Sequence, residues 1–246
     1  LENIRGKSRM NSAFWNNKKV LITGHEGFLG SNLAKTLAGQ GARVTGVDIV
    51  SGRPLTVLSG ICGRIDCVKG DVSDFDFINA LINTKKPAVV FHLAAEAIVS
   101  RAKRDPRRAF SSNVEGTWNV LDAIRTSKSV KAVIVASSDK AYGPSKKLPY
   151  TESTPLLGCH PYDSSKSCAD IIAQAYYRSY NMPVCVMRCG NIYGPGDFNF
   201  SRLIPDAIRC ALKGERFVIR SDGKYIRDYV YVDDIVDGYI LLAERM

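Results

Sequence analysis

Six short apolar runs, rich in β-branched residues and separated by segments of helical pattern, dominate this sequence of 246 residues. Continuous apolar strands are buried on both faces, and parallel strands need a crossover helix between them. The pattern therefore predicts the α/β class, with a doubly wound parallel (Rossmann) sheet that helices cover on both sides. The predicted strands are KVLIT (19–23), ARVTGVD (42–48), IDCVKGD (65–71), AVVFHLAA (88–95), VKAVIVASS (130–138) and PVCVMR (183–188).

The character of the sequence changes after the sixth run. GNIYGPGDFNFSR (190–202) is rich in Gly, Asn and Pro, which predicts an ordered loop. We expect a helix at 202–213, two short strands and a last helix from Asp233 to follow. The chain is thus divided into a sheet domain at 14–188 and a small lobe at 189–246. The lobe should rest on the carboxyl edge of the sheet, where open α/β folds bind ligands.

Composition excludes several classes of protein. The chain is 45% hydrophobic and 24% charged, as globular proteins are. No apolar run approaches the roughly 18 residues of a membrane helix, and the first residues lack the apolar core of a signal peptide. Seven cysteines without a CxxC pair, several of them in apolar runs, indicate buried thiols in a reducing compartment. We expect a cytoplasmic protein with no membrane partner and, since the three histidines are scattered, no metal site.

The net charge of +10 raises the question of nucleic-acid binding. Part of this charge clusters in RAKRDPRR (101–108). No aromatic residues interleave with these charges, and no nucleic-acid motif accompanies them. We therefore interpret the cluster as a solvated surface that can attract an anionic small molecule, and we expect no nucleic-acid partner.

A glycine-rich turn follows the first predicted strand. TGHEGFLG carries Gly24, Gly27 and Gly30 at the mouth of the first helix. Glycines let the backbone approach a pyrophosphate, and a helix N-terminus offers free N–H groups to it. Asp48 ends the second strand, where a carboxylate accepts hydrogen bonds from ribose hydroxyls and repels a 2′-phosphate. The pair of features predicts NAD, in preference to NADP, as cofactor; Asp71, after the third strand, can meet the adenine or cap a helix.

Tyr162 and Lys166 lie four residues apart in YDSSK, at the start of a long predicted helix. This spacing puts both side chains on one face of the helix. A nearby lysine cation favours the phenolate and so lowers the pKa of a tyrosine from its usual value of about 10. Such a tyrosine can take a proton from a sugar hydroxyl, and Ser137 and Ser138 end the preceding strand beside it.

Together with HLAA (92–95), NVEGTWNVL (113–121) and RDYVYVDD (227–234), these motifs resemble the extended short-chain dehydrogenase/reductase family, in its branch of sugar-nucleotide epimerases and dehydratases. The resemblance covers the chain from Phe14 onward. It implies an NAD-binding domain at 14–188 and part of a nucleotide-sugar-binding lobe at 189–246. For catalysis the resemblance implies Ser138, Asp139, Lys140, Tyr162 and Lys166. For binding of the cofactor it implies Gly24, Gly27, Phe28, Leu29, Gly30, Asp48, Asp71, Val72, Leu93, Ala94, Ala95, Asn113, Tyr162 and Lys166. For binding of the nucleotide-sugar substrate it implies Glu96, Arg188, Asn191, Arg202 and Arg227.

Asp139 and Lys140, directly after the strand-end serine, distinguish between branches of that family. Epimerases resemble one another in carrying small or neutral residues at these positions, whereas the 4,6-dehydratases carry an acid and a second proton-transfer group. With HPYDSSKSCAD (160–170), the chain looks most like the CDP-glucose 4,6-dehydratases. After oxidation at C4 of the hexose, a neutral Lys140 can remove the C5 proton and a protonated Asp139 can protonate the departing C6 hydroxyl. Because burial must keep both neutral, we expect their side chains to point apart.

Two alternatives stay open. RDYVYVDD (227–234) has the general family form, which keeps a nucleotide-sugar 4-epimerase in view. Family members usually continue well beyond the helix that starts at Asp233, so the lobe is expected to be incomplete, and a truncated NAD-binding module without turnover is the other alternative. The family resemblance also implies a homodimer, with IIAQAYY (171–177) as its candidate seam.

Overall fold

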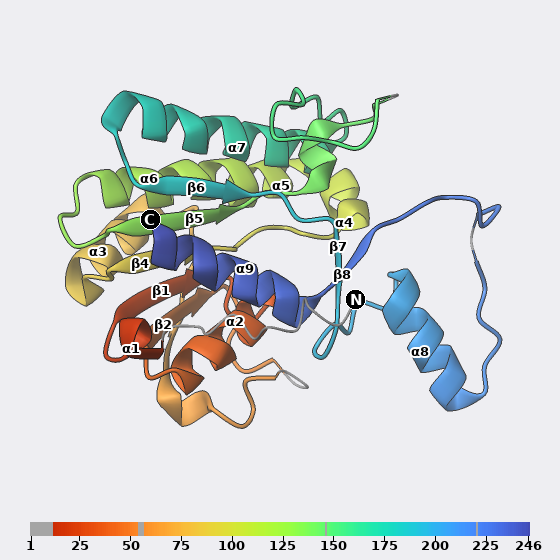
Figure 1. Cartoon of the computed structure of the whole chain (residues 1–246), viewed down its shortest axis with the longest axis horizontal. Helices are drawn as coiled ribbons and strands as arrows, with labels where there is room; N and C mark the ends of the chain where they lie inside the picture. Colours follow the sequence, from red (N-terminus) through yellow and green to blue (C-terminus); the bar gives the residue numbers. More distant parts are fainter. Residues whose placement is uncertain (1–11, 54–56, 146, 220) are drawn as a thin grey trace.

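The computed structural model describes residues 12–53, 57–145, 147–219 and 221–246. Six parallel strands form one sheet in the order β3-β2-β1-β4-β5-β6 (Figure 1). The strand order reverses at β1 and β4, so the crevice beyond their carboxyl ends is the switch point where such folds bind ligands. The predicted doubly wound sheet is confirmed. Its strands are β1 (Lys19–Thr23), β2 (Arg43–Asp48), β3 (Ile65–Lys69), β4 (Val89–His92), β5 (Ala132–Ala136) and β6 (Val184–Met187).

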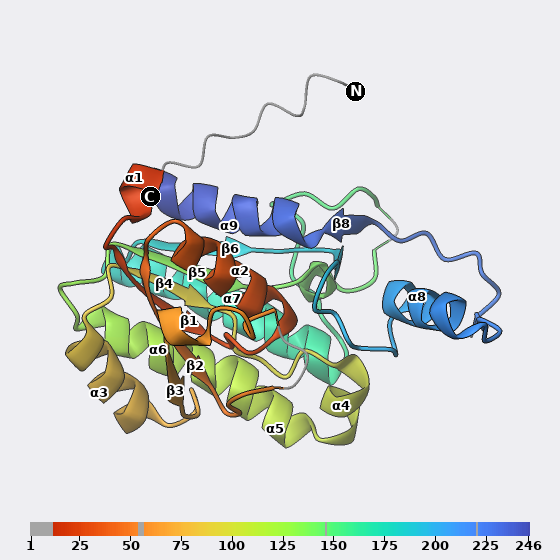
Figure 2. The ribbon, with the colours of Figure 1, turned by 90° about the horizontal axis from the view of Figure 1, so that it is seen from below.

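Helices cover both faces of this sheet (Figures 1 and 2). On one face lie α1 (Ser12–Trp15), α2 (Phe28–Gly39) and α9 (Val232–Arg245). On the other lie α3 (Phe75–Lys85), α6 (Gly116–Arg125) and α7 (Pro161–Tyr180). The short elements are η2 (Cys62–Arg64), α4 (Val99–Arg104), α5 (Pro106–Phe110), the π-helical turn η3 (Ser111–Glu115) and η4 (Asp139–Tyr142).

The two hydrophobic cores follow from the alternation of side chains along the strands. In β1, Val20 and Ile22 face α2 and α9, whereas Leu21 faces α3 and α6. All three are almost completely buried, and each such burial stabilises the fold by about 1.5–3 kcal/mol. Trp15 of α1 is fully buried in the first core and donates a hydrogen bond from Nε1 to Glu244 Oε1 at 2.7 Å. The beginning and the end of the described chain therefore pack together.

The boundary that we expected after Arg188 does not match this packing. Helix α9, which the sequence analysis assigned to the lobe, buries Val236, Tyr239 and Ile240 in the core beside α2. Its apolar side chains recur at helical spacing, and the sheet face beside α2 is the apolar surface available to them. The lobe therefore consists of the segment between β6 and α9, and its main helix is α8 (Leu203–Lys213), which projects beyond the sheet (Figure 1).

The segment predicted as a loop at 190–202 begins with a strand. Strand β7 (Asn191–Tyr193) pairs in parallel with β8 (Tyr229–Tyr231). The two strands that we expected after α8 are reduced to β8, since the described residues of 214–228 contain no strand. Alternation in this short segment misled the prediction. The small β7–β8 sheet leads the chain from the lobe back to α9.

The described residues contain no helix with the length and apolarity needed to span a bilayer.

Candidate active site

The glycine-rich turn between β1 and α2 lies at the switch point of the sheet. Gly24 has a φ of +76°, and a Cβ there would lie 2.8 Å from the backbone N of Ala94. A Cβ on Gly30 would lie 2.1 Å from the carbonyl oxygen of Gly24. The turn is thus packed backbone to backbone, and Gly27 at the N-cap of α2 has no side chain to cover the helix N-terminus. Such a surface fits a pyrophosphate.

Asp48 ends β2 beside this turn and is almost completely buried. Its Oδ2 accepts a hydrogen bond from the Glu26 backbone N–H at 3.2 Å, and its Oδ1 accepts one from Val50 at 3.3 Å. The Arg53 guanidinium lies 3.8 Å from Oδ1. These contacts leave acceptor capacity on a carboxylate at the edge where a ribose is bound in this fold class.

We expect Asp48→Asn to weaken NAD binding by about 10- to 100-fold, since a hydrogen bond to a charged group is worth about 1.5–3 kcal/mol. Binding of NADP should weaken less, because the repulsion of its 2′-phosphate is lost as well. Calorimetric titration with both dinucleotides measures this change in preference. Asp66→Asn, on the exposed side of β3, is the matched control; an unchanged NAD-to-NADP ratio in Asp48→Asn would contradict the assignment.

Glu26, inside the glycine turn, was not singled out by the sequence analysis. It is buried, and its carboxylate accepts backbone hydrogen bonds from Gly52 at 2.8 Å and Arg53 at 3.3 Å. It therefore ties the loop after β2 to the glycine turn. A charged residue between two structural glycines is the signal that could have identified it.

Asp71 and Val72 follow β3 at the same edge. Asp71 Oδ1 accepts a hydrogen bond from the Ser73 N–H at 2.9 Å, while the cap of α3 is Asp74, which accepts from Phe77. The capping role considered for Asp71 therefore belongs to Asp74. Val72 is buried against Gly116 at the start of α6, so its contribution to the edge comes through its backbone.

A hydrogen-bonded network behind HLAA was also missed. His92 is buried; its Nδ1 lies 2.8 Å from Thr23 Oγ1 and its Nε2 lies 3.1 Å from Thr117 Oγ1. Thr117 donates its proton to the Asn113 carbonyl at 2.6 Å, so His92 donates from Nε2 and Thr23 donates to Nδ1. Thr23 Oγ1 in turn accepts from the N–H groups of Leu93 and Ala94. Burial, and then the charge of Lys166, lower the pKa of His92 to about 3, so the ring is neutral.

Asn113 lies in the π-helical turn η3, a distortion frequent at functional sites. Its side chain is buried, and Oδ1 accepts from the Glu96 N–H at 2.7 Å. Its Nδ2 donates to Ser165 Oγ at 2.8 Å and to the Glu96 carbonyl at 3.3 Å. Asn113 thus joins the loop after β4 to helix α7, which carries Tyr162.

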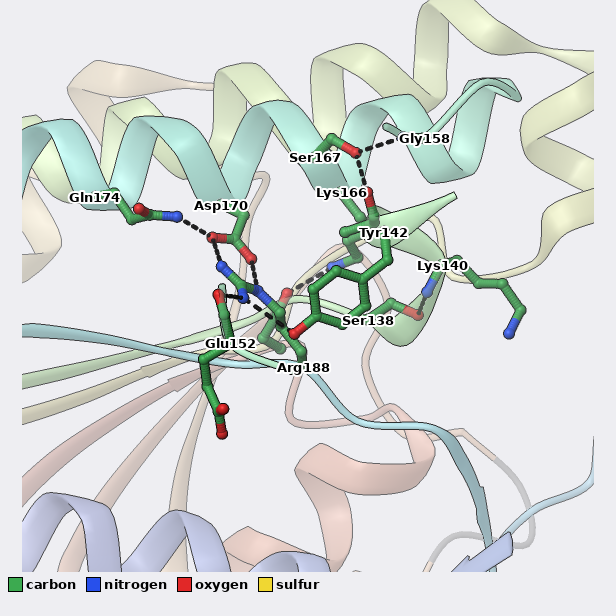
Figure 3. Close-up of polar contacts among 12 residues, drawn as sticks. Ser138, Lys140, Tyr142, Glu152, Gly158, Lys166, Ser167, Asp170, Gln174 and Arg188 are labelled. Atoms are coloured by element: carbon green, nitrogen blue, oxygen red, sulfur yellow. Dashed lines mark hydrogen bonds and ion pairs between the residues drawn. The ribbon is translucent and has the colours of Figure 1, made fainter. Parts of the chain in front are cut away.

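Ser138, Tyr162 and Lys166 come together where β5 ends against the first turns of α7 (Figure 3 shows Ser138 and Lys166). Burial raises the pKa of the partly buried Tyr162, while a hydrogen bond with Ser138 opposes that rise. The charge of Asp139 adds to the rise, and the charge of Arg202 opposes it. We expected Lys166 to lower this pKa; here its Nζ donates instead to the Ala136 carbonyl at 2.8 Å.

Lys166 is buried, and the loss of solvation lowers its pKa to about 8, against smaller opposing effects of Cys189 and Asp170. The folded state therefore binds this proton less tightly than the unfolded chain does. Burying the charged lysine therefore lowers the free energy of unfolding; this loss is complete below pH 8 and disappears as the pH rises toward 10.5. We expect the unfolding free energy of the wild type, minus that of Lys166→Met, to increase by about 3 kcal/mol between these pH values.

Urea denaturation at a series of pH values measures this difference. Lys213→Met, an exposed lysine at the end of α8, is the control and should show no such slope. A difference between wild type and Lys166→Met that does not change with pH would exclude a buried ammonium.

Asp139 and Lys140 begin η4, directly after Ser138. The prediction that they point apart is wrong: Lys140 Nζ lies 2.5 Å from Asp139 Oδ2. Ser138 also donates from Oγ to Asp139 Oδ1 at 3.0 Å. The Lys140 side chain is 40% exposed and that of Asp139 21%, so the ion pair is in contact with solvent.

Arg188 also differs from its predicted role. Nε and Nη2 donate to the two carboxylate oxygens of Asp170, at 2.7 and 2.9 Å, and Asp170 is completely buried (Figure 3). Nη1 donates to the Tyr142 hydroxyl at 3.1 Å and to the Glu152 carbonyl at 3.2 Å. The guanidinium therefore holds α7, the end of η4 and the following loop together, and it is directed toward the protein instead of a sugar.

The other predicted substrate residues are distributed over the lobe and the edge of the sheet. Arg202 occupies the N-cap position of α8 without a side-chain capping bond, and its guanidinium pairs with Asp197 at 3.2 Å. Its charge also acts on Tyr162, so it lies near the site. Asn191 donates to the Asp228 carbonyl within the β7–β8 sheet. Arg227 is exposed, stacks over Tyr225 and is not brought to Tyr162 by any contact of the described residues.

A further sign of a ligand site is a buried polar atom without a partner. Ser137 Oγ, at the carboxyl end of β5, has no hydrogen-bond partner among the described residues, and neither do the two ring nitrogens of His25 in the glycine turn. Unsatisfied buried groups are costly, and these two residues each follow the carboxyl end of a sheet strand. The glycine cradle, Asp48 and these groups fit a dinucleotide.

Comparison with known proteins agrees with this geometry. The sequence profile of the NAD dependent epimerase/dehydratase family matches residues 20–246. The chain belongs to this family. The predicted resemblance and the predicted cofactor, NAD, are therefore confirmed at the level of the family.

Individual relatives carry different activities in their names. The chain is 33% identical over 245 residues, 95% of its length, to a CDP-glucose 4,6-dehydratase of Salmonella typhimurium, and 33% identical over 226 residues, 87% of its length, to a dTDP-glucose 4,6-dehydratase of Xanthomonas campestris. It spans 68% and 64% of the lengths of these two proteins. A crystal structure of a UDP-glucose 4-epimerase from Thermotoga maritima with UDP-glucose superposes with a TM-score of 0.84 at 30% identity, covering 92% of this chain and 73% of that one.

Proposed function

We propose that the protein dehydrates a nucleotide-activated hexose to a 4-keto-6-deoxy sugar nucleotide, as a CDP-glucose 4,6-dehydratase does. The observation that carries this proposal is the Asp139–Lys140 pair beside Ser138. An epimerase needs no further acid and base at this position, whereas an elimination needs both. In this proposal the glycine turn and Asp48 would hold NAD, which would supply the two-electron oxidation at C4 and return the same two electrons at C6 once water has left.

Tyr162 takes the proton from the C4 hydroxyl of the hexose. Burial holds its proton on the oxygen in the resting site. Tyr162 must give up this proton before it can take the one from C4, and the Ser138 hydrogen bond and the Arg202 charge favour that loss. Tyr162 and Ser138 are therefore the groups that hold and move the C4 proton.

The ion pair between Asp139 and Lys140 is one proton transfer away from the reactive state. Moving the proton from Lys140 Nζ to Asp139 Oδ2, across the 2.5 Å contact, leaves a neutral amine and a carboxylic acid. Desolvation by a bound sugar favours this neutral pair over the charged one. Lys140 then takes the C5 proton, Asp139 gives its proton to the C6 oxygen, and one water leaves.

The second candidate is a nucleotide-sugar 4-epimerase. Its support is the structural similarity to the Thermotoga maritima enzyme and the general family form of the segment that includes β8. In this reading Asp139 and Lys140 are a partly exposed surface pair, Tyr162 alone handles the sugar proton, and no water is lost. The two candidates therefore differ by one molecule of water in the product.

Mass spectrometry of the protein with NAD and, in parallel, CDP-glucose, dTDP-glucose, UDP-glucose and GDP-mannose distinguishes them. Loss of one water from one substrate is the expected result, and it names the nucleotide base. No change of mass, together with a second C4 epimer separated by chromatography, would establish the epimerase. Binding of NAD without any product would favour a module that binds the cofactor without turnover.

Variants of the pair complete this experiment. Lys140→Met and Asp139→Asn should each lower the rate of dehydration by about 10²-fold or more, the usual contribution of a positioned acid or base. They should leave NAD affinity unchanged, because neither lies at the glycine turn. Lys147→Met, in the exposed loop that follows η4, is the control. Full dehydration in Lys140→Met would refute its role as the base.

We also propose a homodimer through α6 and α7. Trp118, Ile171 and Tyr177 are large apolar side chains exposed on these helices, while Ala173 of the IIAQAYY segment is buried in the monomer's own core. A sedimentation mass equal to one chain would exclude this assembly. The cytoplasmic location remains a prediction from cysteine usage.

A further inference from the structure

Three side chains of metal-binding type meet where the chain enters α7. Cys159 and His160 are exposed and Asp163 is buried, and one ligand atom from each lies within 4.8 Å of the other two. The sequence predicted no metal site, because it has no CxxC pair and its histidines are scattered. The grouping arises instead from a Cys-His-x-x-Asp segment whose backbone turns into a helix between the second and fifth residues.

The backbone of this segment is held in place independently of these three side chains. Ser164 Oγ donates to the Gly158 carbonyl at 2.8 Å, and the Gly158 N–H donates to Ser167 Oγ at 3.2 Å. The Ser164 N–H donates to the His160 carbonyl at 2.7 Å. Gly158 packs directly on Asp163, since a Cβ there would lie 2.4 Å from the Asp163 carbonyl carbon. Little backbone order therefore has to be gained when a ligand binds here.

We propose that Cys159, His160 and Asp163 form a zinc site that leaves one coordination position open. Thiolate, imidazole and carboxylate are the three donor types that Zn²⁺ takes in proteins, at about 2.0–2.3 Å. Tetrahedral coordination at those lengths separates neighbouring ligand atoms by about 3.3–3.8 Å. The three ligand atoms now lie within 4.8 Å of one another. Rotation of the exposed Cys159 and His160 side chains brings these distances into that range, with Asp163 as the fixed ligand.

The charged groups around Asp163 do not add up to a positive charge that would repel a cation. Lys140 and Asp139 act on the Asp163 carboxylate with opposite signs, and they are paired with each other. The site contains none of the catalytic side chains, although Tyr162 lies between two of its ligands in the sequence. The proposed function can therefore fail without affecting this site, and the reverse also holds.

Titration with Co²⁺, which replaces Zn²⁺ and makes its ligands visible by absorption, tests the proposal without any substrate or NAD. The expected result is one equivalent of bound Co²⁺ with a thiolate-to-metal absorption band, displaced by one equivalent of Zn²⁺. Cys159→Ser should abolish the band. His160→Ala should weaken binding by at least about 10-fold, because loss of even a group that only hydrogen-bonds to a metal ligand costs about that much.

Cys168→Ser is the matched control, since Cys168 is an exposed cysteine on the same helix. It should bind Co²⁺ as the wild type does, and circular dichroism should show all three variants folded; both variant ligands are exposed, so neither substitution disturbs the core. Absence of the band in the wild type, its persistence in Cys159→Ser or its loss in Cys168→Ser would each overturn the proposal.

Discussion

Tyr162→Phe is expected to lower turnover of a nucleotide-activated hexose by about 10²- to 10⁴-fold, the range for loss of a positioned general base. The phenol oxygen is the group that takes the C4 proton, and Ser138 and Arg202 act on that oxygen. Phenylalanine keeps the ring and its packing, so the protein should fold normally. Because the loss is chemical, it should appear in kcat, with KM nearly unchanged.

Two measurements accompany the turnover assay. NAD affinity by fluorescence titration should be nearly unchanged, since Gly24 and Asp48 carry the dinucleotide contacts in our proposal. Tyr177→Phe, the same substitution at an exposed position of the same helix, should have wild-type turnover. Equal turnover of Tyr162→Phe and Tyr177→Phe would show that the base is another residue.

The parts of the fold that the sequence predicted correctly are those with a strong periodic signal. The six sheet strands lie within the six apolar runs. Helix α9 was assigned to the wrong part of the molecule, although its existence was predicted. An apolar helix face shows that a partner surface exists, but chain order does not show whether the sheet or the lobe supplies it.

The candidate site was predictable to a similar degree. Gly24 and Asp48 lie together at the switch point because parallel strands end at one edge, which sequence order alone reveals. The pairing of Arg188 with Asp170 was not predictable, because it joins residues 18 apart on two different elements. An arginine in a family motif is equally consistent with two roles: binding a substrate, or pairing with a buried carboxylate. Only the buried position of Asp170 decides between these readings.

Arg188→Met should lower the free energy of unfolding by about 3–5 kcal/mol, the usual cost of removing one partner of a buried ion pair. Asp170 is completely buried and, among the described residues, would keep a side-chain hydrogen bond from Gln174 Nε2 alone, at 2.8 Å. Chemical denaturation of the variant and the wild type measures the loss. Arg209→Met is the control: it removes two hydrogen bonds to Asp206 Oδ1 and an ion pair with Glu215, both partly exposed, and should cost far less.

The double variant Arg188→Met with Asp170→Leu separates stability from positioning. Replacing both charges with apolar side chains removes the uncompensated carboxylate, so most of the lost stability should return. The contacts of the guanidinium with the Tyr142 hydroxyl and the Glu152 carbonyl do not return. Tyr142 ends η4, the turn that begins with Asp139 and Lys140. If Arg188 positions that turn, the double variant regains stability but not turnover, and Arg188 is a positioning residue. If the double variant regains both stability and turnover, the role of Arg188 is restricted to a structural ion pair.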